Sequence, residues 1–380
     1  MTPFTFPLPV NSGDKQIWGG AQGAALSLAV AEAARRHAGF CLIVTPDQEQ
    51  ADRLRGELDF FIDPAWQLDL LTYPDWETLP YDTFSPHQDI ISQRLHTLYQ
   101  LPRTSRGILI VAASTLMHKT PPASFLEGNS LVLAAGDTFD REKQRHLLES
   151  AGYQCVDTVH EHGDYAMRGS IIDIFPMGSN SPFRIDLFDD EIDTLRIFDP
   201  ETQRSVEQVE RINLLPAREY PLTPEAIAHF KQAFRSRFDV DYRECPLYLD
   251  LSRGLASPGA EYYLPLFFTE MSSLFDYLPD NTLLITTGDI PSAVTRFRDD
   301  LNSRYENRKE DPSRPILPPA GIFLANEELF RQCRLLPGIQ LEQEPVTSKA
   351  GRYNLPVRTV PLARIDHKSS EPFAALQILI

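Results

Sequence analysis

Two patterns of apolar residues recur over the first part of the chain. In residues 24–37 apolar side chains recur at intervals of three and four, a spacing that predicts an amphipathic helix. Residues 40–46 instead form a continuous apolar run that ends at a proline, which is typical of a strand buried on both faces. Further strands are predicted at 67–74 and 108–114, and further helices at 47–61 and 89–101. Because strands and helices alternate, this region is predicted to form a parallel α/β sheet.

The pattern changes near residue 128, where short alternating runs replace the continuous apolar ones. A helix is predicted at 141–150, and short strands are predicted at 153–159, 168–176 and 183–199. In the last of these, Ile185 and Leu187 alternate with polar residues, and a polar turn separates them from a second alternating run. This arrangement predicts a β-hairpin. The whole block is therefore predicted to be a small antiparallel α+β domain inserted into the α/β domain.

The α/β pattern returns near residue 213. A helix is predicted at 224–238, a strand at 282–289 with a helix after it to 305, and a strand at 321–325 with a helix after it to 333. A last helix begins at Ser370 and stops at Ile380 on an apolar face, so the chain is expected to be a fragment of a longer protein. The predicted domains are the two α/β segments 1–127 and 213–347, the inserted domain 128–212, and a linker with the truncated start of a further domain at 348–380.

The stretch from Gly20 to Ser27 falls where a phosphate-binding loop would lie. These two residues fit the template G-x-x-x-x-G-K-[ST]. Ala25, two residues after Gly23, stands in place of the second glycine, and Leu26 stands in place of the lysine. That lysine is the group that reaches the β- and γ-phosphates. The loop is therefore predicted to be a relic strand-to-helix turn that does not bind ATP, with weak anion binding at the helix N-terminus as the alternative.

A magnesium-binding acid of an ATPase is expected at the end of a buried strand. The adjacent pair Asp190–Glu191, followed by Asp193, has the letters of such a motif but lies in the turn of the predicted hairpin. We therefore predict that this chain has no catalytic residues, no metal site and no cofactor of its own.

Charge and composition restrict the partners. The sequence holds 53 acidic against 36 basic residues, a formal net charge of -17. Little DNA binding by this chain is expected, because DNA affinity comes largely from Lys and Arg that neutralise phosphates. The four cysteines are scattered and form no C-x-x-C pair, which disfavours a zinc site and indicates a reducing compartment. No apolar run is long enough to span a membrane and no signal peptide is visible, so a cytoplasmic location is expected.

Five stretches of the sequence together resemble one family. They are residues 20–27, 75–101 (DWETLPYDTFSPHQDIISQRLHTLYQL), 161–179 (EHGDYAMRGSIIDIFPMGS), 183–200 (FRIDLFDDEIDTLRIFDP) and 259–268 (GAEYYLPLFF). They resemble the N-terminal part of the bacterial transcription-repair coupling factors, and the resemblance runs nearly from end to end. It implies a module similar to the excision-repair helicase UvrB. Such a module has a RecA-like P-loop domain in two sequence segments and an inserted domain that recruits UvrA.

The resemblance also implies that Arg168, Arg184 and Phe188 bind UvrA. Arginine and aromatic side chains dominate the energetics of protein interfaces, and arginine pairs well with carboxylates. The period-two alternation places Phe188 on the polar face of the hairpin, away from the apparent core. The alternative is that Arg184 pairs with Asp186 or a neighbouring acid, and that Phe188 packs at the end of the hairpin.

The function implied by the resemblance is that of a non-catalytic adaptor. In such a protein the DNA translocase motor, with its ATP and Mg²⁺, and the contacts to DNA and RNA polymerase lie downstream. The whole protein recognises and releases RNA polymerase stalled at DNA lesions and recruits nucleotide-excision repair, and a C-terminal domain covers the UvrA-binding surface in the resting state. The alternatives are an active UvrB-type ATPase or helicase module, disfavoured by Leu26, and a damaged-DNA-binding module, disfavoured by the charge of -17.

Three other motifs are interpreted as structural. His160 and His162 would share a face if they lay on a strand, but a third metal ligand is not apparent. Residues 113–119 contain a serine and a histidine without the signature of a nucleophile elbow. The aromatic residues of 259–268 are expected to be core rather than a base-stacking platform, because such platforms accompany basic grooves.

Overall fold

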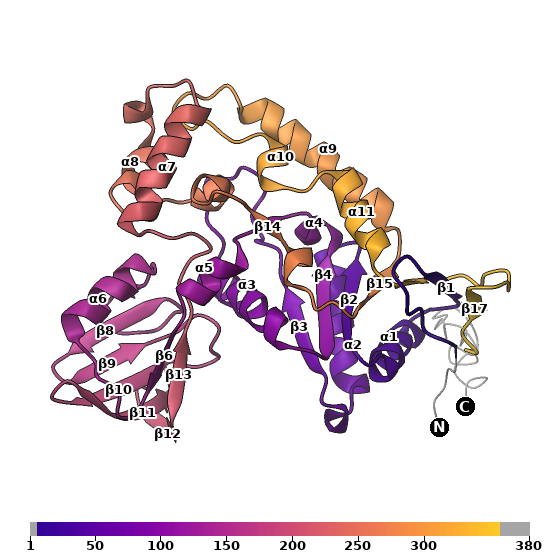
Figure 1. The fold of residues 1–380 in the computed structure, drawn as a ribbon, viewed down its shortest axis with the longest axis horizontal. Helices are drawn as coiled ribbons and strands as arrows, with labels where there is room; N and C mark the ends of the chain where they lie inside the picture. Colours follow the sequence, from indigo (N-terminus) through magenta and orange to yellow (C-terminus); the bar gives the residue numbers. More distant parts are fainter. Residues whose placement is uncertain (1–5, 358–380) are drawn as a thin grey trace, which may run out of the picture.

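The structure, a computed structural model, describes residues 6–357 and shows an α/β fold with a large and a small sheet (Figure 1). The large sheet has seven strands, all parallel, in the order β17-β1-β16-β15-β2-β4-β3. These strands are β1 (Lys15–Gly19), β2 (Phe40–Thr45), β3 (Asp69–Tyr73), β4 (Gly107–Ala112), β15 (Thr282–Thr287), β16 (Gly338–Leu341) and β17 (Arg352–Asn354). The predicted parallel sheet is confirmed. The helix expected from Ser370 lies outside the described residues.

Helices cover both faces of the large sheet. They are α1 (Ala24–Arg36) and α2 (Gln48–Phe61) on one face, and α3 (Gln88–Gln100), α4 (Ala113–Leu116), α9 (Ile290–Arg308) and α11 (Asn326–Leu335) on the other. Ile43 and Ile110 are buried with α1 and α2, whereas the neighbouring Leu42 and Leu109 are buried in the cluster on the opposite face. The central strands β2 and β4 are therefore buried on both faces along their whole length, as the sequence indicated. Within residues 6–357 no helix is long and apolar enough to cross a bilayer.

Two segments of the α/β domain differ from the prediction. The strand expected at 321–325 is instead the short helix α10 (Pro319–Ile322), followed by a single bridge between Phe323 and His118. The run is buried, but a short apolar run does not distinguish a strand from a buried helical turn. The other is 338–354, where no strand was expected. There, β16 lies in the sheet between β1 and β15, and β17, in the segment from 348 that was expected to be a linker, pairs with β1 at the edge of the sheet.

The inserted domain is built on the small sheet, in the order β12-β11-β10-β9-β8-β7. Its elements are α6 (Arg141–Ser150), β7 (Gln154–Cys155), β8 (Asp164–Arg168), β9 (Ile171–Ile174), β10 (Phe183–Phe188), β11 (Glu191–Phe198) and β12 (Ser205–Val209). All neighbouring strands are antiparallel except β7 and β8. The chain enters and leaves this domain through β6 (Leu131–Ala134) and β13 (Arg211–Leu214), which pair antiparallel with each other. The predicted hairpin, β10 and β11, is confirmed.

One strand of this domain was placed wrongly. Residues 168–176 were expected to form one strand, but Gly169 and Ser170 form a turn between β8 and β9. Gly169 has a φ of +58°, a left-handed conformation that glycine adopts without steric cost. Arg168 therefore ends β8 instead of beginning β9.

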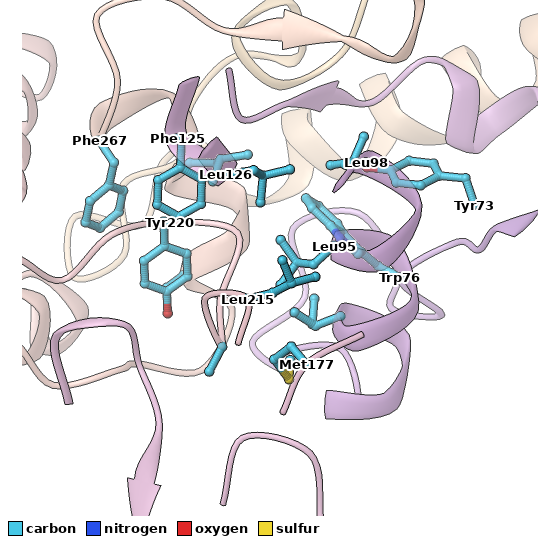
Figure 2. Packing of buried hydrophobic residues seen from close by; sticks show 14 of the residues in the cluster. Tyr73, Trp76, Leu95, Leu98, Phe125, Leu126, Met177, Leu215, Tyr220 and Phe267 are labelled. Atoms are coloured by element: carbon cyan, nitrogen blue, oxygen red, sulfur yellow. The ribbon is translucent and has the colours of Figure 1, made fainter. Parts of the chain in front are cut away.

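A single apolar core joins the inserted domain to the α/β domain. Figure 2 shows Trp76 and Leu95 of the α/β domain beside Met177 and Leu215, which follow β9 and β13. The connecting elements are α5 (Ala123–Gly128), α7 (Pro224–Arg237), α8 (Pro246–Ser252) and the 3₁₀ helix η4 (Ala260–Leu266). Tyr262, Tyr263 and Phe267 are buried in this core and Phe268 is partly buried against it, so the interpretation of 259–268 as core is confirmed.

A buried ion pair lies at the same junction. The Arg94 guanidinium on α3 donates from Nε to a carboxylate oxygen of Glu219 at 2.8 Å, and Trp76 donates to the other oxygen at 2.9 Å. Arg94 also donates to the Pro74 carbonyl at 2.8 Å and lies 4.1 Å from the centre of the Tyr73 ring. Both charged side chains are almost fully excluded from solvent. The pair thereby fixes α3 to the segment that leaves the inserted domain.

The burial of Glu261, in η4, is expected to make the stability of the folded chain depend on pH. It is buried, accepts a hydrogen bond from Ser85 at 2.8 Å, and burial raises its pKa from 4.5 to about 7. The folded chain therefore favours the neutral acid. The free energy of unfolding is therefore highest below the ordinary pKa of 4.5, where Glu261 is neutral in both the folded and the unfolded chain. It falls by about 3 kcal/mol as the pH rises through about 7, because the buried carboxyl must then ionise.

We predict that Glu261→Gln stabilises the chain by about 2–3 kcal/mol at about pH 8 and has little effect at about pH 4. The amide retains an oxygen that accepts the hydrogen bond from Ser85 and never ionises. Urea unfolding of the parent and the variant at both pH values measures this. Equal effects of the substitution at the two pH values would contradict the prediction.

Candidate protein-binding site

Residues 20–27, the loop between β1 and α1 with the first turn of that helix, are the stretch that the sequence predicts to be a relic, and they are called the relic loop below. Several of its backbone amides bond within the chain. The amide of Gly20 donates to the Glu344 carbonyl at 3.2 Å, and that of Ala21 donates to the Glu342 carbonyl at 2.9 Å. The amides of Gln22, Ala25 and Leu26 donate to carbonyls within the loop itself at 3.0–3.1 Å. A phosphate-binding loop uses such amides to hold its ligand.

Two neighbouring segments occupy the space around this loop. The buried Ser27, whose equivalent would bind Mg²⁺ in an active site, donates its hydroxyl to the Glu57 carboxylate of α2. Residues 342–355 cover the start of the loop, where the amide of Leu355 donates to the Gly19 carbonyl at 2.9 Å. A Cβ atom on Gly19 would lie only 2.6 Å from the Val346 nitrogen. The loop is thus closely packed against its own chain, beside a carboxylate.

The outer face of the small sheet carries the residues that the sequence singled out. Ile185 and Leu187 are buried against the core, whereas Phe188 is 75% exposed on the opposite face. The predicted alternation along β10 is therefore confirmed. Arg184 lies on the same outer face and pairs across the sheet with Asp173 of β9.

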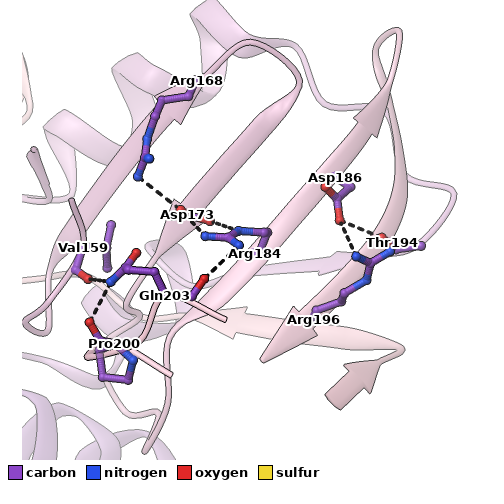
Figure 3. Close-up of polar contacts among 9 residues, drawn as sticks. All are labelled: Val159, Arg168, Asp173, Arg184, Asp186, Thr194, Arg196, Pro200 and Gln203. Atoms are coloured by element: carbon purple, nitrogen blue, oxygen red, sulfur yellow. Dashed lines mark hydrogen bonds and ion pairs between the residues drawn. The ribbon is translucent and has the colours of Figure 1, made fainter. Parts of the chain in front are cut away.

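Arg168 and Arg184 converge on one buried carboxylate (Figure 3). Arg184 binds Asp173 through two nitrogens at 2.7 and 2.9 Å, and Arg168 reaches the same carboxylate at 3.4 Å. Asp173 is the neighbouring acid of the alternative interpretation, and Asp186 is not the partner of Arg184. Asp186 instead accepts from Thr194 at 3.0 Å and forms an ion pair with a third arginine of this face. The structure therefore brings Arg168 and Arg184 together.

Phe188 lies at the end of the same face. The turn that follows it and the turn between β8 and β9 are connected by the side chain of Arg141. Arg141 of α6 donates to the Gly169 carbonyl at 2.8 Å and to the Asp189 carbonyl at 3.3 Å. Ile171, directly opposite Arg168 across β8 and β9, is also exposed. The candidate surface is defined here as Arg168, Ile171 and Phe188, with Arg184 on the other side of Asp173 from Arg168.

Sequence reasoning missed Ile171, Arg141 and Asp173. The signal for Asp173 was present, because it is an acid within the apolar run 171–175. It had no interpretation while that run and Arg168 were assigned to one continuous strand. A turn after Arg168 reverses the strand, which brings Arg168 and Asp173 to the same face.

His162 and His118, one from each of the two histidine motifs, are bonded or packed within the chain. His160 and His162 lie in a loop, not on a strand, and the His162 ring contacts the Asp89 carboxylate at 2.6 Å and the Ser179 carbonyl at 2.7 Å. His118, in 113–119, is buried, and burial holds its pKa well below the ordinary range. Across residues 6–357 no cluster of three or more His, Cys, Asp or Glu side chains could hold a metal ion.

Comparisons with known proteins identify the family. A family model of the UvrB interaction domain matches residues 131–220. The chain is 46% identical to a transcription-repair-coupling factor of Escherichia coli (strain K12), over 98% of this chain and 32% of that protein. The same-named protein of Haemophilus influenzae is 42% identical over the same shares, and that of Bacillus subtilis (strain 168) is 27% identical over 71% of this chain and 24% of that protein.

These matches agree with the parallel sheet and with the separate small sheet that carries the candidate surface. The chain spans about a third of the length of the first two relatives, 32% in each case. It therefore belongs to the family of transcription-repair-coupling factors, as the counterpart of their UvrB-like N-terminal module.

Proposed function

We propose that the outer face of the inserted domain binds UvrA. The observation that carries the proposal is that an exposed phenylalanine, Phe188, and the exposed Arg168 lie on one face of the small sheet, inside the region that matches the UvrB interaction domain. An exposed aromatic side chain that shares a face with an incompletely paired arginine has the composition of an interface hot spot. Binding would remove the apolar ring from water and give the guanidinium a second partner.

The role we assign to this chain is that of an adaptor without catalytic activity. It supplies a docking face, while the rest of the protein, which this chain does not contain, supplies the ATP-driven motor and the contacts with DNA and stalled RNA polymerase. The net charge of -17 supports a protein partner over DNA for this part. Its recruitment of UvrA would connect a stalled polymerase to nucleotide-excision repair.

Isothermal titration of the purified chain with UvrA tests the proposal. We expect saturable binding with a negative heat-capacity change, the signature of buried apolar surface. Binding should weaken only moderately as salt is added, because Phe188 contributes without charge. An absence of saturable heat, confirmed by a pull-down at low salt, would overturn the proposed function.

The packing around the relic loop predicts that restoring the missing lysine does not restore ATP binding. In Leu26→Lys, the loop amides still donate to carbonyls of the chain, and Ser27 still donates to Glu57. The Glu57 carboxylate also remains to repel the phosphates. Titration with ATP and Mg²⁺ should show no binding at micromolar concentrations for either the parent or the variant.

An assay of phosphate release from ATP should likewise show no turnover for either the parent or Leu26→Lys. Turnover in the parent that disappears when the loop is altered would favour the alternative of an active UvrB-type ATPase. Turnover in Leu26→Lys alone would show that the lysine was the sole missing part.

A further inference from the structure

We propose that Asp173 is a positioning residue of the docking face, which acts through Arg184 and Arg168 and does not itself touch the partner. The inference rests on the proposed UvrA-binding function. It assigns different roles to the two arginines: Arg184 is an internal brace, and Arg168 is the arginine that meets the partner.

The first step of the argument is the burial of Asp173. Its side chain is 2% exposed, and it lies in the middle of the sheet on β9, directly opposite Arg184 on β10. A buried carboxylate is costly unless it is paired and hydrogen bonded. The two bonds from Arg184, at 2.7 and 2.9 Å, provide that pairing in the planar, two-pronged geometry that arginine and carboxylate share.

The second step is that Arg184 has little left to offer a partner. Its remaining terminal nitrogen donates to the Gln203 carbonyl at 3.2 Å, and its guanidinium carbon lies 5.0 Å from the centre of the Phe198 ring. Its side chain is only 19% exposed. The hydrogen bond to Asp173 raises the pKa of Arg184, in agreement with a permanently charged, fixed group.

The third step is the contrast with Arg168. Its side chain is 55% exposed, and its ion pair with Asp173, at 3.4 Å, is the longest of the contacts on this carboxylate. One carboxylate faces two guanidinium groups, so one positive charge is left without an opposite charge on Asp173. Asp173 thus holds Arg168 near its bound orientation while leaving most of its donors available, which lowers the entropy cost of binding.

A double-mutant cycle tests whether Asp173 acts through Arg168. The affinity for UvrA is measured by titration for the parent, Asp173→Asn, Arg168→Ala and the double variant. We expect Asp173→Asn to weaken binding by about tenfold in the parent and by less than about twofold in the Arg168→Ala background. A purely structural role would give the same loss in both backgrounds, and that result would overturn the inference.

Asp186→Asn is the matched control. Asp186 lies on the same face, two residues from Arg184, and its charge also attracts that guanidinium, but its bonds are to Thr194 and Arg196. We expect its substitution to change the affinity for UvrA by less than about twofold. A loss as large as that of Asp173→Asn would mean that any acid on this face has the same effect, which also contradicts the proposal.

A measurement without UvrA separates this inference from the proposed function. The Nε–H signal of Arg184 in an NMR spectrum of the free chain should exchange slowly with water, and should exchange rapidly or vanish in Asp173→Asn. An unchanged signal would overturn the positioning role even if UvrA binds the parent. If the parent does not bind UvrA, the proposed function fails. Loss of the Arg184 signal in Asp173→Asn would still show that Asp173 holds Arg184 in place.

Should Asp173→Asn fail to fold, Arg184→Lys takes its place in the cycle. Lysine keeps the charge but lacks the planar, two-pronged geometry of the guanidinium, so the brace is weakened without leaving a buried unpaired acid. We expect the same non-additivity with Arg168→Ala, with a clear loss of affinity for UvrA in the parent and a loss of less than about twofold in the Arg168→Ala background. Full additivity in this second cycle overturns the proposal.

Discussion

Replacing Glu219 with alanine is expected to lower the free energy of unfolding by about 3–5 kcal/mol. The substitution leaves the Arg94 guanidinium buried without its carboxylate and leaves the Trp76 indole N–H without its acceptor. The bond of Arg94 to the Pro74 carbonyl and its position over the Tyr73 ring offset only part of this loss. Urea unfolding followed by far-ultraviolet circular dichroism measures the effect without relying on Trp76 fluorescence.

An exposed ion pair provides the control for this prediction. Glu328→Ala removes a partner of Arg331 on the surface of α11, and surface pairs contribute about 0–1 kcal/mol. A second test replaces the buried pair as a whole, with Arg94→Met and Glu219→Leu together. This double variant should be more stable than Glu219→Ala alone, because no charge is left buried. A loss below about 1 kcal/mol in Glu219→Ala would show that water or a neighbouring group compensates the arginine.

Replacing Phe188 with alanine is expected to weaken the binding of UvrA by about 30-fold or more, which corresponds to about 2 kcal/mol. The Phe188 ring is 75% exposed in the free chain, so its truncation removes contact area from the interface without leaving a cavity in the core. The stability of the chain should therefore change by less than about 0.5 kcal/mol, as for other surface substitutions. Titration of UvrA and thermal unfolding of the variant measure the two quantities separately.

Two matched variants distinguish a specific contact from general stickiness. Phe60→Ala removes a phenylalanine that is 83% exposed on α2, outside the inserted domain. Val206→Ala removes an apolar side chain that is 71% exposed on β12, elsewhere on the small sheet. Both should bind UvrA as the parent does. If Phe60→Ala weakens binding as much as Phe188→Ala, the assignment of the docking face is wrong.

The sequence predicted the features that depend on local pattern. The continuous apolar runs placed β2, β4 and β15, because a central parallel strand is buried on both faces. The alternation along β10 separated Ile185 and Leu187 from Phe188, because side chains on a strand point to opposite faces in turn. The UvrB-like architecture followed from the resemblance of longer stretches.

Features that depend on contacts between distant segments could not be predicted. The partner of Arg184 is eleven residues away in the sequence but directly opposite on the next strand, a pairing that only the strand register determines. Likewise, the closing of the relic loop depends on β17 and on carbonyls of residues 342–344, more than three hundred residues further along the chain. A missing lysine was visible at position 26, but the internal bonding of the amides around it was not.

The way in which the inserted domain is attached has a mechanical consequence. Its entry and exit strands, β6 and β13, lie side by side and run in opposite directions, and its inner face shares one core with the parallel sheet. A force applied to the outer face would therefore act on the hydrogen bonds between β6 and β13 and on the shared apolar core, and not on a flexible linker. A protein bound at Phe188 would therefore rotate and translate together with the α/β domain.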